Sequence, residues 1–278
     1  MTTAHARAAG SRTGGPGATS ATTLRVAGPV ILAVTALVAL IVALAYGGGA
    51  APLVIADAGP VVRWGLPIAT LVLNLAAATM VGALVLALFG LRPEDRAFEV
   101  ALDTASIGAA VFTVAAAVTG FFTFVNVFNA APSADAVFGQ QLGRFLVEVE
   151  LGRTWLITTV AGAVLTVLTF AVRAWTPTLL VAILALASLV PMGTQGHSGE
   201  LENHSVAVTS LVLHILAAAV WLGGLVLLVV IRPVVARSGQ IALLRRYSSI
   251  ALVAFIVVAV SGSVRAWVSV EALPALLS

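Results

Sequence analysis

The sequence contains no cysteine and no lysine, and only 9% of its 278 residues are charged. The absence of cysteine excludes disulfides, thiolate metal ligands, iron–sulfur clusters and a cysteine nucleophile. The absence of lysine excludes Schiff-base chemistry, since all 14 basic residues are arginine. No arginine-rich run is interleaved with aromatic residues, so nucleic-acid binding is not predicted. The chain is instead 60% apolar, with a mean hydropathy of +1.11, which indicates that lipid surrounds most of it.

Seven apolar runs predict membrane-spanning helices, because a helix needs about 20 residues to cross ~30 Å of hydrocarbon. The predicted fold is therefore all-α, a polytopic transmembrane helix bundle formed by residues 26–278. Residues 1–25 lack hydrophobic periodicity and predict a disordered cytoplasmic tail. A cleaved signal peptide is the alternative for the first run, although that run is long for one. The runs cover residues 29–46, 64–90, 100–127, 153–172, 177–193, 205–231 and 247–270.

The arginine distribution predicts the orientation of the bundle. If the seven runs alternate in direction, ten of the 14 arginines fall on the side that holds the N-terminus. Connections rich in basic residues stay in the cytoplasm, so the N-terminus is predicted to be cytoplasmic and the connection before the sixth run to face outward. The ten are Arg7, Arg12, Arg25, Arg92, Arg96, Arg173, Arg232, Arg237, Arg245 and Arg246.

Small residues inside the runs predict where neighbouring helices approach closely. A glycine lets two helix backbones come into contact, and membrane helices use this often. The serine-glycine-serine sequence centred on Gly262 fits the same interpretation. The other glycines interpreted in this way are Gly82, Gly108, Gly120 and Gly162.

Three of the four histidines lie close together in the sequence. His197 and His204 belong to an acidic connection, whereas His214 lies inside the sixth apolar run. An ionisable side chain within the bilayer is costly and therefore suggests a functional site. His204 and His214 are ten residues apart, or about 15 Å along a helix, too far to bind one ion together. The spacing predicts an outer capture site and a separate internal site.

The residue types around these histidines point to a soft or borderline metal ion. The capture site would use His197, His204, Glu200, Glu202 and Met192. Imidazole suits copper, zinc, iron and nickel, and a thioether favours Cu(I). The alternative is that the histidines of the connection are merely solvated and that His214 is neutral and hydrogen-bonded between helices.

Two further polar or aromatic residues lie near the predicted internal site. Trp221 follows His214 by seven residues and shares its helix face, so a cation could lie over the indole or the ring could simply pack. Asn74 lies at a depth similar to that of His214. It is either a supporting partner of the site or the donor of an interhelical hydrogen bond.

The sixth and seventh runs resemble the CopD copper-resistance family. Gly196 and His197 begin the acidic connection and His204 ends it. The segment LVLHILAAAVWLGGL then carries His214, Trp221, Gly223 and Gly224. Arg246-Tyr247-Ser248 before the last run and the segment from Glu150 to Trp155 are also similar to the family. The CopD-like core is placed at about residues 190–278.

The resemblance implies copper ion transport in the bacterial plasma membrane, for import or for delivery to cuproprotein assembly. The implied partners are the copper ion, the lipid bilayer, and either a periplasmic copper-binding protein or a CtaG-like oxidase-assembly membrane domain. A subunit that supports cytochrome oxidase assembly without transporting copper, or that senses copper, is the alternative within this class.

The sequence also allows two other classes of function to be considered, an intramembrane protease and a haem protein. Gly196-His197-Ser198-Gly199 matches the G-x-S-G of rhomboid proteases, but no histidine follows His214 to act as base, so an enzyme is not predicted. A b-type haem electron carrier needs two axial ligands at matching depth, and only His214 with a weak partner such as Met80 would serve. No P-loop is present, so ATP hydrolysis is not predicted to drive transport.

Overall fold

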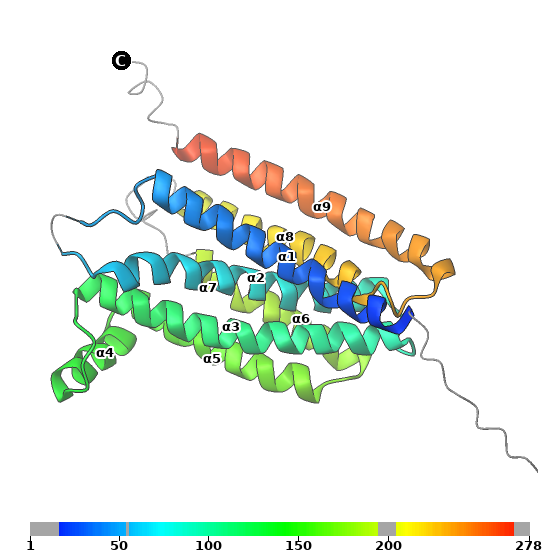
Figure 1. Cartoon of the computed structure of the whole chain (residues 1–278), viewed down its shortest axis with the longest axis horizontal. Coiled ribbons are helices and arrows are strands. Elements are labelled where there is room, and N and C mark those ends of the chain that lie inside the picture. Colours follow the sequence, from blue (N-terminus) through cyan, green and yellow to red (C-terminus); the bar gives the residue numbers. More distant parts are fainter. Residues whose placement is uncertain (1–16, 54–55, 194–203, 270–278) are drawn as a thin grey trace, which may run out of the picture.

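A computed structural model of the chain describes residues 17–53, 56–193 and 204–269 (Figure 1). Within these ranges seven segments are helical, long and apolar enough to cross a membrane, which confirms the predicted all-α bundle. The fifth of these segments is divided into two helices around Leu189. The helices are α1 (Gly17–Tyr46), α2 (Pro60–Gly90), α3 (Arg96–Phe128), α5 (Glu150–Ala171), α6 (Trp175–Ser188) with α7 (Val190–Gly193), α8 (His204–Ile231) and α9 (Arg237–Ser269).

The first helix begins earlier than the sequence suggested. α1 starts at Gly17, so residues 17–25 are helical rather than part of the predicted tail of residues 1–25. The reason is cooperativity: once the apolar span has formed a helix, each added residue gains a hydrogen bond without a new nucleation cost. Residues 1–16 lie outside the described residues.

α2 is the central helix of the bundle and packs directly on α3 and α8. The glycines predicted to mark close contacts are found there. A Cβ atom added to Gly82 would lie 2.2 Å from the backbone of Gly223 on α8, and one added to Gly108 would lie 2.8 Å from the amide nitrogen of Met80. The helices therefore cross backbone to backbone, and no side chain larger than hydrogen fits at these points.

Hydroxyl groups join α3 to α5. Thr113 Oγ1 lies 3.0 Å from Thr166 Oγ1, and Ser106 Oγ lies 3.0 Å from the carbonyl oxygen of Thr169 as well as 2.8 Å from that of Leu102 on its own helix. Gly120 and Gly162 lie on the same interface, against Trp155 and Thr113 respectively. Small residues and hydroxyl hydrogen bonds are the usual means by which membrane helices associate.

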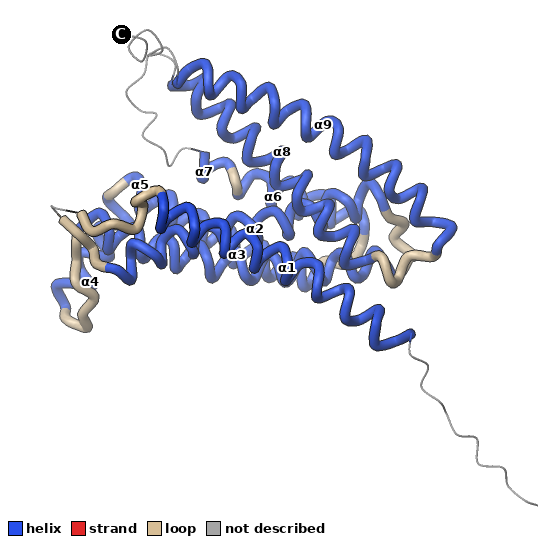
Figure 2. Tube along the Cα trace, turned by 45° about the horizontal axis from the view of Figure 1, so that its top comes forward, coloured by secondary structure: helices blue, strands red, loops and turns tan. Residues whose placement is uncertain are grey.

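α9 lies on one side of the bundle and runs alongside α8 (Figure 2). Only 17% of its most apolar segment is buried by the rest of the protein, against 67% for α2. The aliphatic residues of its outward face, such as Leu252 and Val253, are exposed to the surrounding lipid. α9 is therefore a peripheral helix held mainly by α8.

A short amphipathic helix, α4 (Ala136–Glu148), connects α3 to α5 and projects from one end of the bundle (Figure 1). Its buried Phe145 packs against Phe124 and Phe128 of α3, with ring centroids 5.5 and 5.9 Å apart. This helix was not predicted from the apolar runs, because it is too short to span the membrane. The apolar spacing of Phe138, Leu142 and Phe145 is the signal that indicates it.

The N-cap of α4 gives a testable prediction. Asp135 Oδ1 accepts a hydrogen bond from the backbone N–H of Phe138 at 2.7 Å, and this bond, with a smaller contribution from the Ser133 hydroxyl, lowers the pKa of Asp135. In the Asp135→Ala protein the Phe138 amide should exchange its hydrogen roughly fivefold faster than in the parent. In the Asp135→Ser protein the cap should be retained, and exchange should be as slow as in the parent. Hydrogen exchange followed by mass spectrometry measures the difference.

The pH dependence of this cap has a definite sign. Because the folded protein lowers the pKa of Asp135 below its ordinary value of 3.8, the cap stabilises α4 fully above that value. The stabilisation is lost as the pH falls through the lowered pKa of the folded state. Equal exchange at Phe138 in the parent and Asp135→Ala proteins at neutral pH would contradict the assignment.

Candidate functional site

His214 lies within the membrane-spanning part of α8, ten residues after the helix begins at His204. This places it about 15 Å along the helix axis, near the middle of the span. The imidazole is partly buried and faces α9, where Gly262 leaves room for it: a Cβ atom at Gly262 would lie 3.6 Å from His214 Cε1. The internal histidine is thus held at the interface between α8 and α9.

The contact between His214 and α9 favours one tautomer of the imidazole. His214 Nδ1 lies 3.2 Å from Ser261 Oγ, while the Ser261 hydroxyl lies 2.6 Å from the carbonyl oxygen of Val257 on its own helix. A hydroxyl has one proton, and the shorter contact assigns it to Val257. With the hydroxyl proton directed to Val257, Ser261 Oγ can accept from the Nδ1–H tautomer of His214, and in that tautomer the lone pair lies on Nε2. A nitrogen in this state is a metal ligand.

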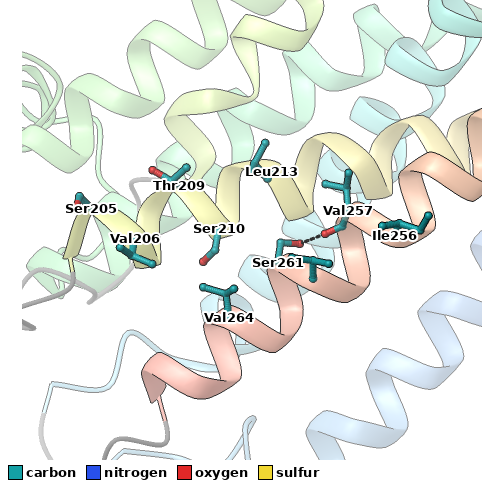
Figure 3. Close-up of a pocket in the computed structure, with 10 residues that line it drawn as sticks. Ser205, Val206, Thr209, Ser210, Leu213, Ile256, Val257, Ser261 and Val264 are labelled. Carbon is teal, nitrogen blue, oxygen red and sulfur yellow. Dashed lines mark hydrogen bonds between the residues drawn. The ribbon is translucent and has the colours of Figure 1, made fainter.

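A groove of about 500 Å³ separates α8 from α9 and reaches from the first turn of α8 to Ser261 (Figure 3). Four hydroxyl-bearing residues contribute to its walls, and in Figure 3 Ser210 points from α8 towards Val264 of α9. The other wall residues are aliphatic. The hydroxyls are those of Ser205, Thr209, Ser210 and Ser261.

Ser261 belongs both to this groove and to the hydrogen bond with His214. The groove therefore leads from the end of α8 that carries His204 to the side chain that orients the internal imidazole. From the sequence alone, Ser261 is only a small residue at a predicted helix contact. The helix pairing was needed to recognise it, since it lies far from His214 in the sequence.

The predicted capture site falls largely outside the described residues. His197, Glu200 and Glu202 belong to residues 194–203, and His204 is described only as the first backbone position of α8. Met192 lies in α7, partly buried against the core. Among the residues that the structure describes, no three histidine, aspartate or glutamate side chains form a group suited to a metal ion. The capture site stays a prediction.

Trp221 packs against α9. Its ring meets that of Phe255 edge to face, with centroids 5.8 Å apart, and its carbonyl oxygen accepts a hydrogen bond from the Tyr247 hydroxyl at 2.9 Å. The indole is 39% exposed. The contact with Phe255 agrees with the packing interpretation, and a role in holding a cation stays a prediction.

Asn74 and Met80 both lie on α2. Asn74 is exposed, and its side chain forms no hydrogen bond with the described part of the chain, so its supporting role stays a prediction. Met80, the weak haem partner considered above, is fully buried where Gly108 of α3 contacts its backbone. His214, in contrast, contacts Ser261 and Gly262 of α9.

These features define a multi-pass helical membrane protein with a histidine held between its last two spans. Comparison with protein families matches residues 55–205 to the copper resistance protein D-like, N-terminal domain. The match covers more than half of the chain, which therefore belongs to the copper resistance protein D-like family and is linked to copper handling. Neither the search of curated proteins nor the search of solved structures found a match.

The family match confirms the resemblance seen in the sequence and places it differently along the chain. It extends from the start of α2 to the first turn of α8, and so includes Met192, His197 and His204. His214 and Ser261 lie beyond it. The CopD-like core predicted at residues 190–278 overlaps the match only at its beginning, and the resemblance over the last two spans stays a prediction.

Proposed function

We propose that this protein transports copper ions across the membrane, with His214 as the ligand within the bilayer and the groove between α8 and α9 as the outer part of the passage. Family membership supports copper as the ion. The observation that carries the proposal is the contact between His214 Nδ1 and Ser261 Oγ, because Ser261 also lines the groove and the contact leaves Nε2 available as a ligand atom. The protein acts here as a transporter and not as an enzyme.

A single imidazole held by one hydroxyl is better suited to a copper ion that passes through the protein than to one that is stored there. An ion must bind strongly enough to enter the membrane and weakly enough to leave. A neutral histidine whose second nitrogen is held by a neighbouring group has a fixed orientation and a more basic ligand atom. His214 and Ser261 form such a pair, and the groove hydroxyls offer oxygen contacts to the ion on its way inward.

The direction of transport follows from the proposed orientation. With the arginine-rich ends of the helices in the cytoplasm of a bacterial plasma membrane, the groove opens outward. The proposed capture site is then formed by His197, His204, Glu200, Glu202 and Met192. A periplasmic copper-binding protein or an oxidase-assembly membrane domain is the proposed partner. The membrane potential contributes about 2.3 kcal/mol per 100 mV for each inward-moving charge, which favours import without ATP.

Reconstituted vesicles test the proposal. Purified protein in proteoliposomes with a copper-chelating dye inside should take up copper faster than protein-free vesicles when the interior is negative. Ser198→Ala should take up copper at the same rate as the parent, since the proposal gives Ser198 no catalytic role. Copper uptake equal to that of protein-free vesicles would refute transport. A Soret band in the absorbance spectrum would favour the haem alternative.

A further inference from the structure

A second pocket, also of about 500 Å³, lies at the end of α9 opposite the groove. It is enclosed by the connection between α2 and α3 and the connection between α8 and α9, which meet at one end of the bundle (Figure 1). Its polar wall is formed by Arg92, Asp95, Arg96, Ser238 and Arg246. This basic pocket has no part in the copper passage proposed above.

The basic pocket carries an excess of positive charge, with three guanidinium groups against one carboxylate. The ion pairs found in the described part of the chain are Arg63–Asp57 and Arg173–Asp103, so Arg92 and Arg96 are unpaired there. Arg246 donates a hydrogen bond to the carbonyl oxygen of Gly90 at 3.1 Å, which holds its guanidinium at the pocket wall. Unpaired guanidinium groups in one cavity favour an anion with several oxygen atoms.

The backbone adds to this preference. α3 begins at Arg96 and α9 begins at Arg237, so the positive ends of two helix dipoles lie at the same pocket. Free N–H groups at helix N-termini, together with arginine side chains, are typical partners of phosphate. The Ser238 hydroxyl provides a further donor.

The position of the basic pocket indicates where such an anion would come from. It lies at the ends of four spans, the level at which lipid headgroups surround the protein. Its apolar wall, which includes Leu91, Val235 and Leu243, suits the first carbons of an acyl chain. Basic pockets between membrane helices are known to hold anionic headgroups.

We propose that the basic pocket binds a phosphate group, carried by an anionic phospholipid headgroup or present as free phosphate. Purified full-length protein in non-ionic detergent micelles can be titrated with phosphatidylglycerol, with phosphatidylcholine or with inorganic phosphate. Thermal unfolding and mass spectrometry of retained lipid report binding. Phosphatidylglycerol should raise the Tm of the parent protein, and phosphatidylcholine should not. If inorganic phosphate alone raises the Tm equally, the source is free phosphate.

Variants locate the binding. Arg92→Gln with Arg96→Gln should weaken phosphatidylglycerol retention roughly 30-fold, since each arginine near an anionic lipid contributes about a factor of five. Both side chains are exposed and form no hydrogen bond with described residues, so the fold should be retained. Arg96→Gln alone is the milder second variant, with a loss of about fivefold.

The matched control is Arg144→Gln, which removes the same charge from the exposed surface of α4 at the other end of the bundle. The Arg144→Gln protein should retain as much phosphatidylglycerol as the parent. Equal retention by the parent and the Arg92/Arg96 variant would overturn the proposal, as would equal retention of phosphatidylglycerol and phosphatidylcholine. Copper is not part of this measurement, so its outcome is independent of the transport proposal.

Discussion

His214→Ala should abolish copper uptake into proteoliposomes and into cells while leaving the amount of protein unchanged. The substitution removes the proposed ligand within the bilayer but only one hydrogen bond between α8 and α9. Such bonds in membranes are worth only about 0.6 kcal/mol on average, so the fold should tolerate the loss. Equal copper uptake by the variant and the parent at equal expression would refute the role of His214.

Substitutions of Ser261 distinguish a role in positioning the His214 ring from a role in packing α9 against α8. Ser261→Ala removes the acceptor for His214 Nδ1–H and should weaken copper binding by roughly 10–100-fold, the usual cost of losing a group that orients a metal ligand. Ser261→Thr restores a hydroxyl and should recover much of the binding. Ser249→Ala, the same change at an exposed site of α9 where the hydroxyl bonds only to Arg245 O, is the matched control and should bind copper normally.

The second large effect concerns the crossing of α2 and α8. Gly223→Ala places a Cβ atom 1.7 Å from the carbonyl oxygen of Ala78, a distance that requires the two backbones to move apart. Overpacking of a well-packed interface costs typically 1–3 kcal/mol, and more when backbone must yield. The variant should be produced in much lower amounts, unfold at lower temperature in detergent and be cleaved more readily by protease.

The controls for this crossing are glycines at which a Cβ atom can be added without a clash. Gly143→Ala on α4 adds a Cβ atom with nothing within 4 Å, and alanine is a better helix former, so stability should be unchanged or slightly higher. Gly262→Ala brings its Cβ atom to an ordinary 3.6 Å contact with the His214 ring and should also fold. A Gly223→Ala protein as stable as the parent would contradict the backbone crossing.

The membrane-spanning helices were predictable because their signal is local: each is a long apolar run. The close contact at Gly82 was predictable for a similar reason, since glycine in a span has few other uses. α4 was missed because an amphipathic helix of 13 residues gives no hydropathy signal of a span. The division between α6 and α7 at Leu189 also required the structure.

Only part of the candidate site was predictable from the sequence. His214 was recognisable because an imidazole inside an apolar run is costly. Ser261 was not, since its role depends on α9 packing beside α8 in a register that no local pattern encodes. The same holds for the basic pocket, whose Arg92, Arg96 and Arg246 come from distant parts of the chain. The contributions of His197, Glu200 and Glu202 remain sequence predictions.

α9 forms a wall of both cavities, through its first turns at the basic pocket and through its later turns at the groove. Between them, the Tyr247 hydroxyl ties the helix to the Trp221 carbonyl oxygen of α8. Further along, α9 also contacts α8 through Ser261 Oγ at His214 Nδ1 and through Phe255 at the Trp221 ring. One helix of 33 residues therefore contributes to both cavities, so a substitution that displaces α9 should alter phosphate binding and copper binding together.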